Sequence, residues 1–251
     1  MFTDTHCHIL STEYYKPEDI IENLENNNIK RIIINGYTNK TNKEVIELAK
    51  KYDNVYGALG IHPDNIIENI DETINLIEEN KDNPKIIAIG EIGLDYYHNK
   101  DNKDKQIELL ETFFKLAEKN NLPVIIHNRD ATDDLLKTLK KYHLKGTIHC
   151  FSGSTETAKE YIKLGFKLGI GGVLTFKNSH IRETLKEIPL SNILLETDSP
   201  YLTPYPLRGI PNEPMYLKFI ADELCNIYNI SLEELIKKLE QNYLDIFDNK
   251  N

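Results

Sequence analysis

The sequence predicts an α/β fold in which eight parallel strands and their helices close into a (β/α)8 barrel. Short apolar segments alternate with longer amphipathic segments throughout the 251 residues. Such strand–helix alternation is typical of a parallel sheet. Eight strand–helix units in about 250 residues match the usual size of this barrel. We therefore expect residues 1–251 to form one barrel domain.

The predicted strands are short, rich in Ile, Val and Leu, and bounded by Gly, Pro, Asn or Asp, as strands usually are. In chain order they are residues 2–9, 31–36, 55–61, 86–94, 124–127, 147–151, 167–173 and 193–197. A doubly wound open sheet is the competing fold, but it normally carries a glycine-rich phosphate turn after its first strand. Residues 4–11, DTHCHILS, hold no such turn, which favours the TIM-like barrel.

Helical periodicity fills the segments between and after these strands. Residues 106–119 show apolar side chains at helical spacing, namely Ile107, Leu110, Phe113, Phe114 and Ala117. Residues 155–164 form another predicted helix, with Ser154 as its N-cap. Two more helical segments, near 215–228 and 232–247, follow the eighth strand. The proline-rich residues 200–214 are predicted to form a long loop after that strand.

Charge and cysteine content limit the classes of function. The formal net charge is −10, whereas a broad nucleic-acid surface usually has a basic footprint. A metal-centred pocket is compatible with this charge, because divalent ions reverse the local field. Three cysteines without a CxxC pair argue against a disulfide framework and favour a reducing compartment. With no signal peptide and no long apolar run, we expect a cytoplasmic protein that does not enter a membrane.

Polar side chains gather at the carboxyl ends of the predicted strands, where barrel enzymes place their chemistry. His6 and His8 alternate along the first strand and therefore share one face, with Asp4 below them. The later strand ends contribute His62, Glu91, Asp95, His127, Arg129, His149, Glu196 and Asp198. The sequence thus predicts a polar rim at one end of the barrel.

Six members of this rim suit a pair of divalent metal ions: His6, His8, Glu91, His127, His149 and Asp198. Imidazole and carboxylate are the ligands that borderline divalent metals prefer, and six groups exceed the needs of one tetrahedral ion. Two ions bridged by a carboxylate can hold a hydroxide nucleophile and neutralise an oxyanion. Each residue alone has an ordinary structural explanation. Together they would be hard to bury without a cation.

The other histidines and two cysteines receive different interpretations. His62 lies at a strand end, where it could meet a substrate. Alternation along a strand turns Cys7 and Cys150 away from the neighbouring histidines, so both are interpreted as packing residues rather than ligands. Three histidines fall in predicted loops or helices and are expected at the surface: His98, His143 and His180.

These motifs resemble those of the TatD-type metal-dependent deoxyribonucleases, a branch of the amidohydrolase superfamily. The matching stretches occur in the family's order and cover nearly the whole chain: DTHCHI, GIHP, GEIGLDYY, HNRDA, HCFSG, LLETDSPYLTP and RGIPNEP. The resemblance implies a barrel with a two-metal site at the C-terminal ends of its strands. It assigns one ion to His6, His8 and Asp198, the second to His127 and His149, and the bridge to Glu91.

The resemblance also implies substrate contacts. His62, Arg129 and Arg208 match positions that lie around the substrate phosphate in the family. The family loop often reads RG, then Lys or Arg, then xNEP, whereas Ile210 takes the basic position here. We expect this departure to affect substrate affinity or preference, and to leave the metal centre intact.

The leading functional hypothesis is hydrolysis of DNA phosphodiester bonds by a metal-activated water. Asp198 and Glu91 are the candidate catalytic residues: Asp198 orients the water and accepts its proton, and Glu91 bridges the metals. The arginines neutralise phosphate charge. Asp4 and Glu196 are candidates to orient ligand histidines. The resemblance implies 3′→5′ exonuclease action on single-stranded DNA, and an acidic protein with a compact cationic pocket suits a strand end.

Alternatives stay open at this point. The same rim could attack an ester or amide carbonyl, as in an aminoacyl-tRNA deacylase, and the family also implies endonucleolytic cleavage at damaged sites. A metal-binding protein without catalysis is a third hypothesis, which the complete ligand set disfavours. Four imidazoles favour Zn or Mn over Mg by ligand softness, while nucleases often use Mg or Mn. The sequence leaves the oligomeric state undetermined.

Overall fold

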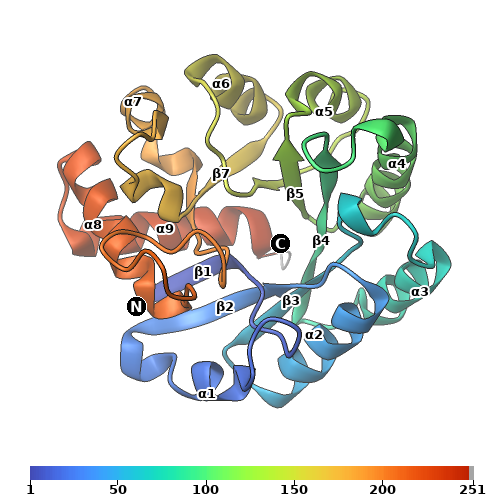
Figure 1. Ribbon diagram of the computed structural model, residues 1–251, viewed down its shortest axis with the longest axis horizontal. Coiled ribbons are helices and arrows are strands. Elements are labelled where there is room, and N and C mark those ends of the chain that lie inside the picture. Colours follow the sequence, from blue (N-terminus) through green and yellow to red (C-terminus); the bar gives the residue numbers. More distant parts are fainter. Residues whose placement is uncertain (249–251) are drawn as a thin grey trace.

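Eight parallel strands stand in chain order in one sheet in the computed structural model, which describes residues 1–248. The sheet curls into a barrel with helices around it (Figure 1), so the predicted (β/α)8 fold is confirmed. The strands are β1 Phe2–Cys7, β2 Ile29–Asn35, β3 Val55–Leu59, β4 Ile86–Asp95, β5 Val124–Arg129, β6 Gly146–Ile148, β7 Phe166–Ile170 and β8 Ile193–Leu195.

The helices follow the predicted pattern. They are α1 Pro17–Glu22, α2 Asn39–Lys51, α3 Ile70–Asn80, α4 Lys103–Asn120, α5 Thr132–Leu139, α6 Thr155–Lys163, α7 Ile181–Lys186, α8 Leu217–Tyr228 and α9 Leu232–Phe247. Ser154 caps α6, because its side chain accepts a hydrogen bond from the backbone N–H of Thr157 at 3.3 Å. None of the helices within residues 1–248 has the length and apolar character needed to cross a bilayer.

Several strand ends differ from the prediction. β6 ends before His149, which the prediction placed on the strand, and β8 ends at Leu195 instead of residue 197, so His149 and Asp198 both lie in the loops that follow. In these loops Cys150 and Asp198 adopt left-handed backbone conformations, with φ of 48° and 58°. β4 and β5 are longer than predicted and reach Asp95 and Arg129. His62 also lies past its strand, at the start of the 3₁₀ helix η2 (Pro63–Asn65).

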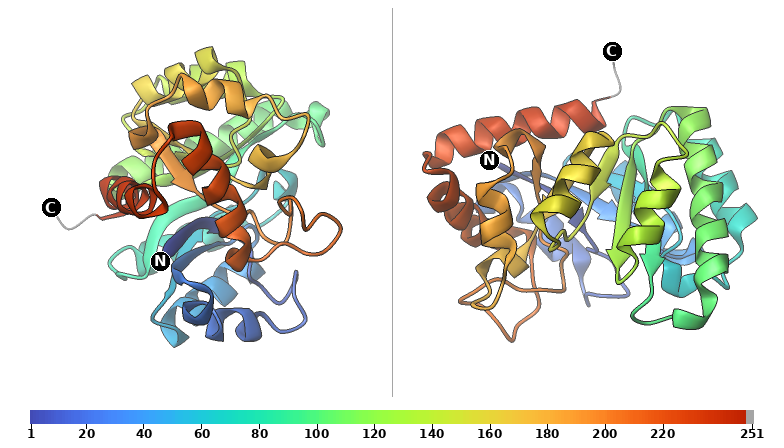
Figure 2. Two further views of the ribbon diagram at one scale, coloured as in Figure 1. Left: turned by 90° about the vertical axis from the view of Figure 1, so that its left-hand side faces the viewer. Right: turned by 90° about the horizontal axis from the view of Figure 1, so that it is seen from above.

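The inside of the barrel is closed at one end by α9. Tyr243, Ile246 and Phe247 of α9 form one buried cluster with residues of five strands: Ile33, Ala58, Ile87, Ala88, Ile125 and Leu194. The right-hand view of Figure 2 shows α9 at one end of the barrel and the long loop of residues 200–214, coloured orange, at the other. The open end therefore belongs to the loops that follow the strands, which is where the polar rim lies.

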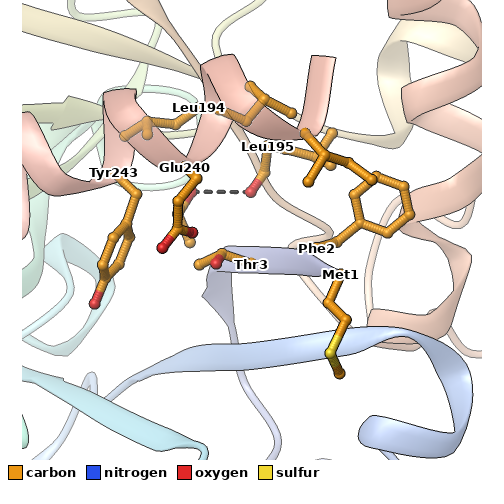
Figure 3. Close-up of a pocket in the computed structure, with 10 residues that line it drawn as sticks. Met1, Phe2, Thr3, Leu194, Leu195, Glu240 and Tyr243 are labelled. Atoms are coloured by element: carbon orange, nitrogen blue, oxygen red, sulfur yellow. Dashed lines mark hydrogen bonds between the residues drawn. The ribbon is translucent and has the colours of Figure 1, made fainter. Parts of the chain in front are cut away.

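The barrel is completed where β1 meets β8. The N–H of Asp198 donates to the carbonyl of His6 at 2.9 Å, and the N–H of His8 donates to the carbonyl of Ser199 at 2.7 Å. Deeper in the barrel, the Thr5 hydroxyl donates to the Leu195 carbonyl at 3.1 Å, shown dashed in Figure 3. The cavity beside this bond has a volume of about 10 Å³, too small for a substrate. The backbone that closes the barrel thus carries three of the predicted ligands.

Candidate metal centre

Two histidine pairs face each other at the open end of the barrel. The Nε2 atoms of His6 and His8 lie 3.2 Å apart. Nδ1 of His127 lies 3.1 Å from Nε2 of His149. His6 and His8 approach as the alternation on the first strand predicts, although β1 itself ends at Cys7. Cys7 points into the wall, where its thiol donates to the Ile33 carbonyl at 3.4 Å, consistent with a packing role.

The Glu91 carboxylate stands between the two pairs. Its Oε2 atom lies 3.4 Å from His6 Nε2 and 3.3 Å from His8 Nε2. Its Oε1 atom lies 3.1 Å from His127 Nδ1 and 2.9 Å from His149 Nε2. Each oxygen therefore faces one histidine pair, which is the arrangement expected of a carboxylate that bridges two ions.

Asp198 completes the group around the first pair. Its Oδ1 atom lies 3.5 Å from His6 Nε2 and 3.6 Å from His8 Nε2. The structure thus brings all six predicted ligands into one cluster. Their roles as ligands stay a prediction that rests on donor chemistry.

The donor set fits divalent cations. Ring nitrogens of two histidines converge on one carboxylate oxygen in each half of the site, so their lone pairs can meet at a shared point. Among residues 1–248, the ion-pair partners of Glu91 and Asp198 are histidines, with no lysine or arginine. Two buried carboxylates without a permanent cation are costly. Metal ions would supply the missing positive charge.

The electrostatics of the protein alone point the same way. Burial lowers the pKa values of His8 and His127, but the neighbouring carboxylates outweigh burial and raise both to about 9. Burial raises the pKa of Glu91, yet the surrounding histidines hold it well below its usual range. The carboxylates therefore stay ionised and attract positive charge to this point, either as protons on imidazole or as a metal ion.

A cleft of about 560 Å³ opens above the cluster, lined by His62 and Arg129 among others. Burial lowers the pKa of His62 to about 4, which keeps its ring neutral. Its Nδ1 atom accepts the backbone N–H of Asp64 at 3.1 Å. Its proton is therefore on Nε2, which lies 3.6 Å from Glu91 Oε1. His62 thus presents an N–H donor to the floor of the cleft.

The two predicted phosphate-binding arginines lie in different places. Arg129 lines the cleft, and its guanidinium lies 4.0 Å from the centre of the Tyr97 ring. Arg208 lies outside the cleft wall formed by the described residues. Its guanidinium is 4.4 Å from the centre of the Phe176 ring and donates to the Thr203 carbonyl at 3.1 Å. The structure therefore brings Arg129 to the site and leaves Arg208 at the surface of the loop after β8.

The supporting contacts differ from those predicted. The Asp4 carboxylate accepts hydrogen bonds from the Thr197 backbone N–H at 3.0 Å and from the Thr197 hydroxyl, so it holds the loop that carries Asp198 rather than a histidine ring. Glu196 lies closer to its predicted role, with Oε1 3.8 Å from His149 Nδ1. The buried Nδ1 of His149 has no hydrogen-bond partner among the described residues.

Sequence reasoning gave no role to two supporting residues. Asp95 belongs to the predicted polar rim, and its Oδ2 accepts hydrogen bonds from His127 Nε2 at 3.1 Å and His98 Nδ1 at 2.9 Å. His98, predicted at the surface, is half-exposed but lies at the cleft rim. Buried Asn212 donates to the carbonyls of Thr197 and Tyr201 at 2.8 and 2.7 Å, bracing the loop after β8. Their motifs, GEIGLD and NEP, were the available signals.

A (β/α)8 barrel with four histidines and two carboxylates at its strand ends defines the protein as a metal-dependent hydrolase. The chain belongs to the family described as TatD related DNase, whose model matches residues 3–248. It is 39% identical over 252 residues to the metal-dependent hydrolase YabD of Bacillus subtilis, covering 98% of this chain and 99% of that protein.

Solved structures agree with this assignment. The TatD homologue YjjV of Escherichia coli superimposes with a TM-score of 0.91 at 30% sequence identity, covering 98% of both chains. A TatD family hydrolase from Entamoeba histolytica superimposes with a TM-score of 0.85 at 26% identity, covering 98% of this chain and 97% of that one. The similarity extends over the full barrel, including every strand that carries a candidate ligand.

Proposed function

We propose that this protein is a metal-dependent deoxyribonuclease that hydrolyses phosphodiester bonds at the 3′ ends of single-stranded DNA. The observation that carries the proposal is the division of the Glu91 oxygens between two histidine pairs at the floor of the cleft. Two bound divalent ions, Zn, Mn or Mg, would lower the pKa of a water and neutralise charge on the phosphoryl group.

The side chains around the cluster suit this reaction. Asp198 stays ionised, because the hydrogen bonds from His6 and His8 outweigh the effect of burial and hold its pKa well below the ordinary range. It is therefore available to orient the attacking water and accept its proton. The Nε2–H group of His62 and the guanidinium of Arg129 can each donate to a phosphoryl oxygen.

The shape and charge of the cleft favour the end of a DNA strand as the substrate. Its volume of about 560 Å³ is that of a small-molecule pocket rather than a groove for a duplex. The net charge of −10 also disfavours long phosphate contacts outside the cleft. A terminal nucleotide can enter such a pocket while the rest of the strand leaves past Arg129.

The acidic residues that line the cleft also suit a second class of substrate, the aminoacyl esters. Glu13 and Asp64 contribute carboxylates to the cleft wall, and a carboxylate attracts the ammonium group of an aminoacyl ester. A two-metal hydrolase of esters or amides, such as an aminoacyl-tRNA deacylase, is therefore the second candidate function.

The test is a substrate panel with metal-reconstituted protein. Metal content is first measured by elemental analysis, and protein loaded with Zn, Mn or Mg is then given 5′-labelled single-stranded oligonucleotides. The proposal predicts a ladder that shortens from a free 3′ end, with circular single strands left intact. Cleavage of the circles would indicate an endonuclease. Hydrolysis of aminoacyl-tRNA without any DNA cleavage would favour the second candidate and overturn the first.

A further inference from the structure

One wall of the cleft is built by three residues from three different loops, Glu13, Tyr37 and Tyr201, which follow β1, β2 and β8. The Tyr37 hydroxyl donates to Glu13 Oε1 at 2.6 Å, and the Tyr201 hydroxyl donates to Glu13 Oε2 at 2.9 Å. We call these residues the Glu13 wall. A single carboxylate thus fixes two aromatic rings, which lie far apart in the sequence, at the rim of the metal centre.

Both rings of the Glu13 wall stand against a candidate ligand. The ring centroids of Tyr37 and Tyr201 lie 5.5 and 6.2 Å from that of His8, in edge-to-face arrangements. Tyr201 is nevertheless 50% exposed. Because its hydroxyl is bound and the half-exposed residue lines the cleft, Tyr201 offers a fixed aromatic side chain to whatever enters the cleft. Aromatic rings placed in this way are the usual surfaces on which single-stranded bases stack.

Two sides of the cleft carry side chains of opposite charge. The negative Glu13 lies on the β1 side, and the positive Arg129 lies at the end of β5, across the metal centre. Both oxygens of Glu13 accept hydrogen bonds from hydroxyl groups, and no cation pairs with it among the described residues. Successive phosphates of a strand are therefore attracted toward Arg129 and repelled from the Glu13 wall. This repulsion favours a group without a phosphate of its own beside Glu13.

We propose that the Glu13 wall is the subsite for the terminal nucleoside of the strand: its base stacks on Tyr201, and Glu13 rejects a strand that ends in a phosphate. This inference rests on the proposed nuclease function and names the part of the substrate that each side of the cleft receives. The enzyme should accordingly act on 3′-hydroxyl ends, release one nucleotide at a time and discriminate weakly among bases, because every base has a stacking face.

The test uses three matched single-stranded oligonucleotides, which end in a normal 3′ nucleoside, in an abasic tetrahydrofuran residue, or in a 3′-phosphate. We expect kcat/KM for the normal end to exceed that for the abasic end by about tenfold to a hundredfold, as base–aromatic stacking predicts. Tyr201→Leu should remove this difference by slowing only the base-bearing substrate, whereas Tyr201→Phe should retain most of it. Equal slowing of both substrates by Tyr201→Leu would show a purely structural role and overturn the proposal.

Glu13→Gln tests the charge. It should reduce the difference in kcat/KM between the oligonucleotide with a 3′-hydroxyl end and the one with a 3′-phosphate. An unchanged difference would show that Glu13 does not select against the phosphate. Tyr205→Leu is the matched control, since Tyr205 is 46% exposed on the same loop as Tyr201 and lies outside the cleft wall. Tyr205→Leu should leave the ratios of kcat/KM among the three oligonucleotides at their wild-type values.

A second readout does not depend on turnover. The dissociation constants of the same three oligonucleotides, measured by fluorescence anisotropy in the Asp198→Asn background, should show the same order and the same response to Tyr201→Leu. If metal-loaded wild-type protein hydrolyses none of the DNA substrates, the proposed function itself fails. If it hydrolyses all three equally, the nuclease proposal stands and the subsite proposal falls.

Discussion

Asp95 and His127 form a hydrogen bond on the side of the histidine ring that faces away from the metal centre. His127 Nε2 lies 3.1 Å from Asp95 Oδ2, while His127 Nδ1 lies 3.1 Å from Glu91 Oε1. The carboxylate therefore holds one imidazole proton on Nε2, so Nδ1 is the nitrogen that would bind a cation. Carboxylate–histidine–metal arrangements of this kind orient the ring and increase its basicity.

Asp95→Asn should weaken the affinity for the second metal ion by about tenfold to a hundredfold, as loss of such support does. An amide cannot hold the ring proton as a carboxylate does. Chelator competition followed by elemental analysis measures the effect. His98→Gln is the control, because it removes the other ring on Asp95 and leaves His127 in place. Equal losses in both variants would contradict the orienting role of Asp95.

Asp198→Asn should lower turnover by about 100- to 10,000-fold, the usual contribution of a general base. The fold should persist, because Asn tolerates the left-handed backbone that Asp198 adopts at φ 58°. Initial rates on a 5′-labelled oligonucleotide with a free 3′ end, together with a circular dichroism melt, check both points. Asp64→Asn, a carboxylate change in the same cleft wall, should remain within a few-fold of wild type. Turnover of Asp198→Asn at that level would exclude the residue as the base.

Gly169→Ala should destabilise the protein by about 1–3 kcal/mol, the cost of overpacking. A Cβ atom at Gly169 would lie 2.0 Å from Glu196 Oε2, and Glu196 is buried beside His149. Gly171→Ala is the control two residues away, because its Cβ would meet the Glu196 carbonyl oxygen at an ordinary 3.6 Å. In urea unfolding, Gly169→Ala should have a lower midpoint than Gly171→Ala. Equal midpoints would show that a Cβ atom at position 169 does not clash with Glu196.

Glu240→Gln should destabilise the protein by about 1–3 kcal/mol at neutral pH, as loss of a hydrogen bond to a charged group does. Burial raises the pKa of Glu240, but hydrogen bonds from Lys30 and Arg31 outweigh burial and lower it below its ordinary value. A carboxylate with a lowered folded-state pKa stabilises above its unfolded value, near 4.3, and loses that contribution as pH falls through the folded value.

The difference between wild type and Glu240→Gln should therefore shrink when unfolding is measured at about pH 3 instead of pH 7. Lys30→Gln is the control: the Lys30 side chain is 51% exposed, so its removal should cost no more than about 1 kcal/mol. A difference that does not change with pH would mean that packing of Glu240, rather than its charge, stabilises α9.

The six candidate ligands were predictable because two simple rules place them. Side chains two residues apart share a face of a strand, and the carboxyl ends of parallel strands meet at one end of a barrel. Those rules hold for His6 and His8 even though β1 ends between them. β8 ends at Leu195, three residues before the left-handed turn at Asp198, and the Asp198 carboxylate still lies near the histidines.

Contacts between loops could not be predicted in this way. Glu13 bonds to residues 24 and 188 positions away in the chain, and no local periodicity relates them. For Arg208, a sequence motif did suggest a role, namely binding the substrate phosphate. The loop, however, turns its guanidinium onto the ring of Phe176. The hydrogen-bonding partner of Asp95 depended on the orientation of the His127 ring, which packing decides and strand alternation does not.

The joint between the first and last strands has a consequence for the synthesis of this protein. His6 and His8 are made well before Asp198 and Ser199, the residues whose backbone groups hold them in place. The metal centre therefore cannot be completed on a growing chain until Asp198 and Ser199 have been made. A chain cut short before this joint lacks Asp198 and the backbone groups that hold His6 and His8, so we expect it to be inactive although it contains the other five candidate ligands.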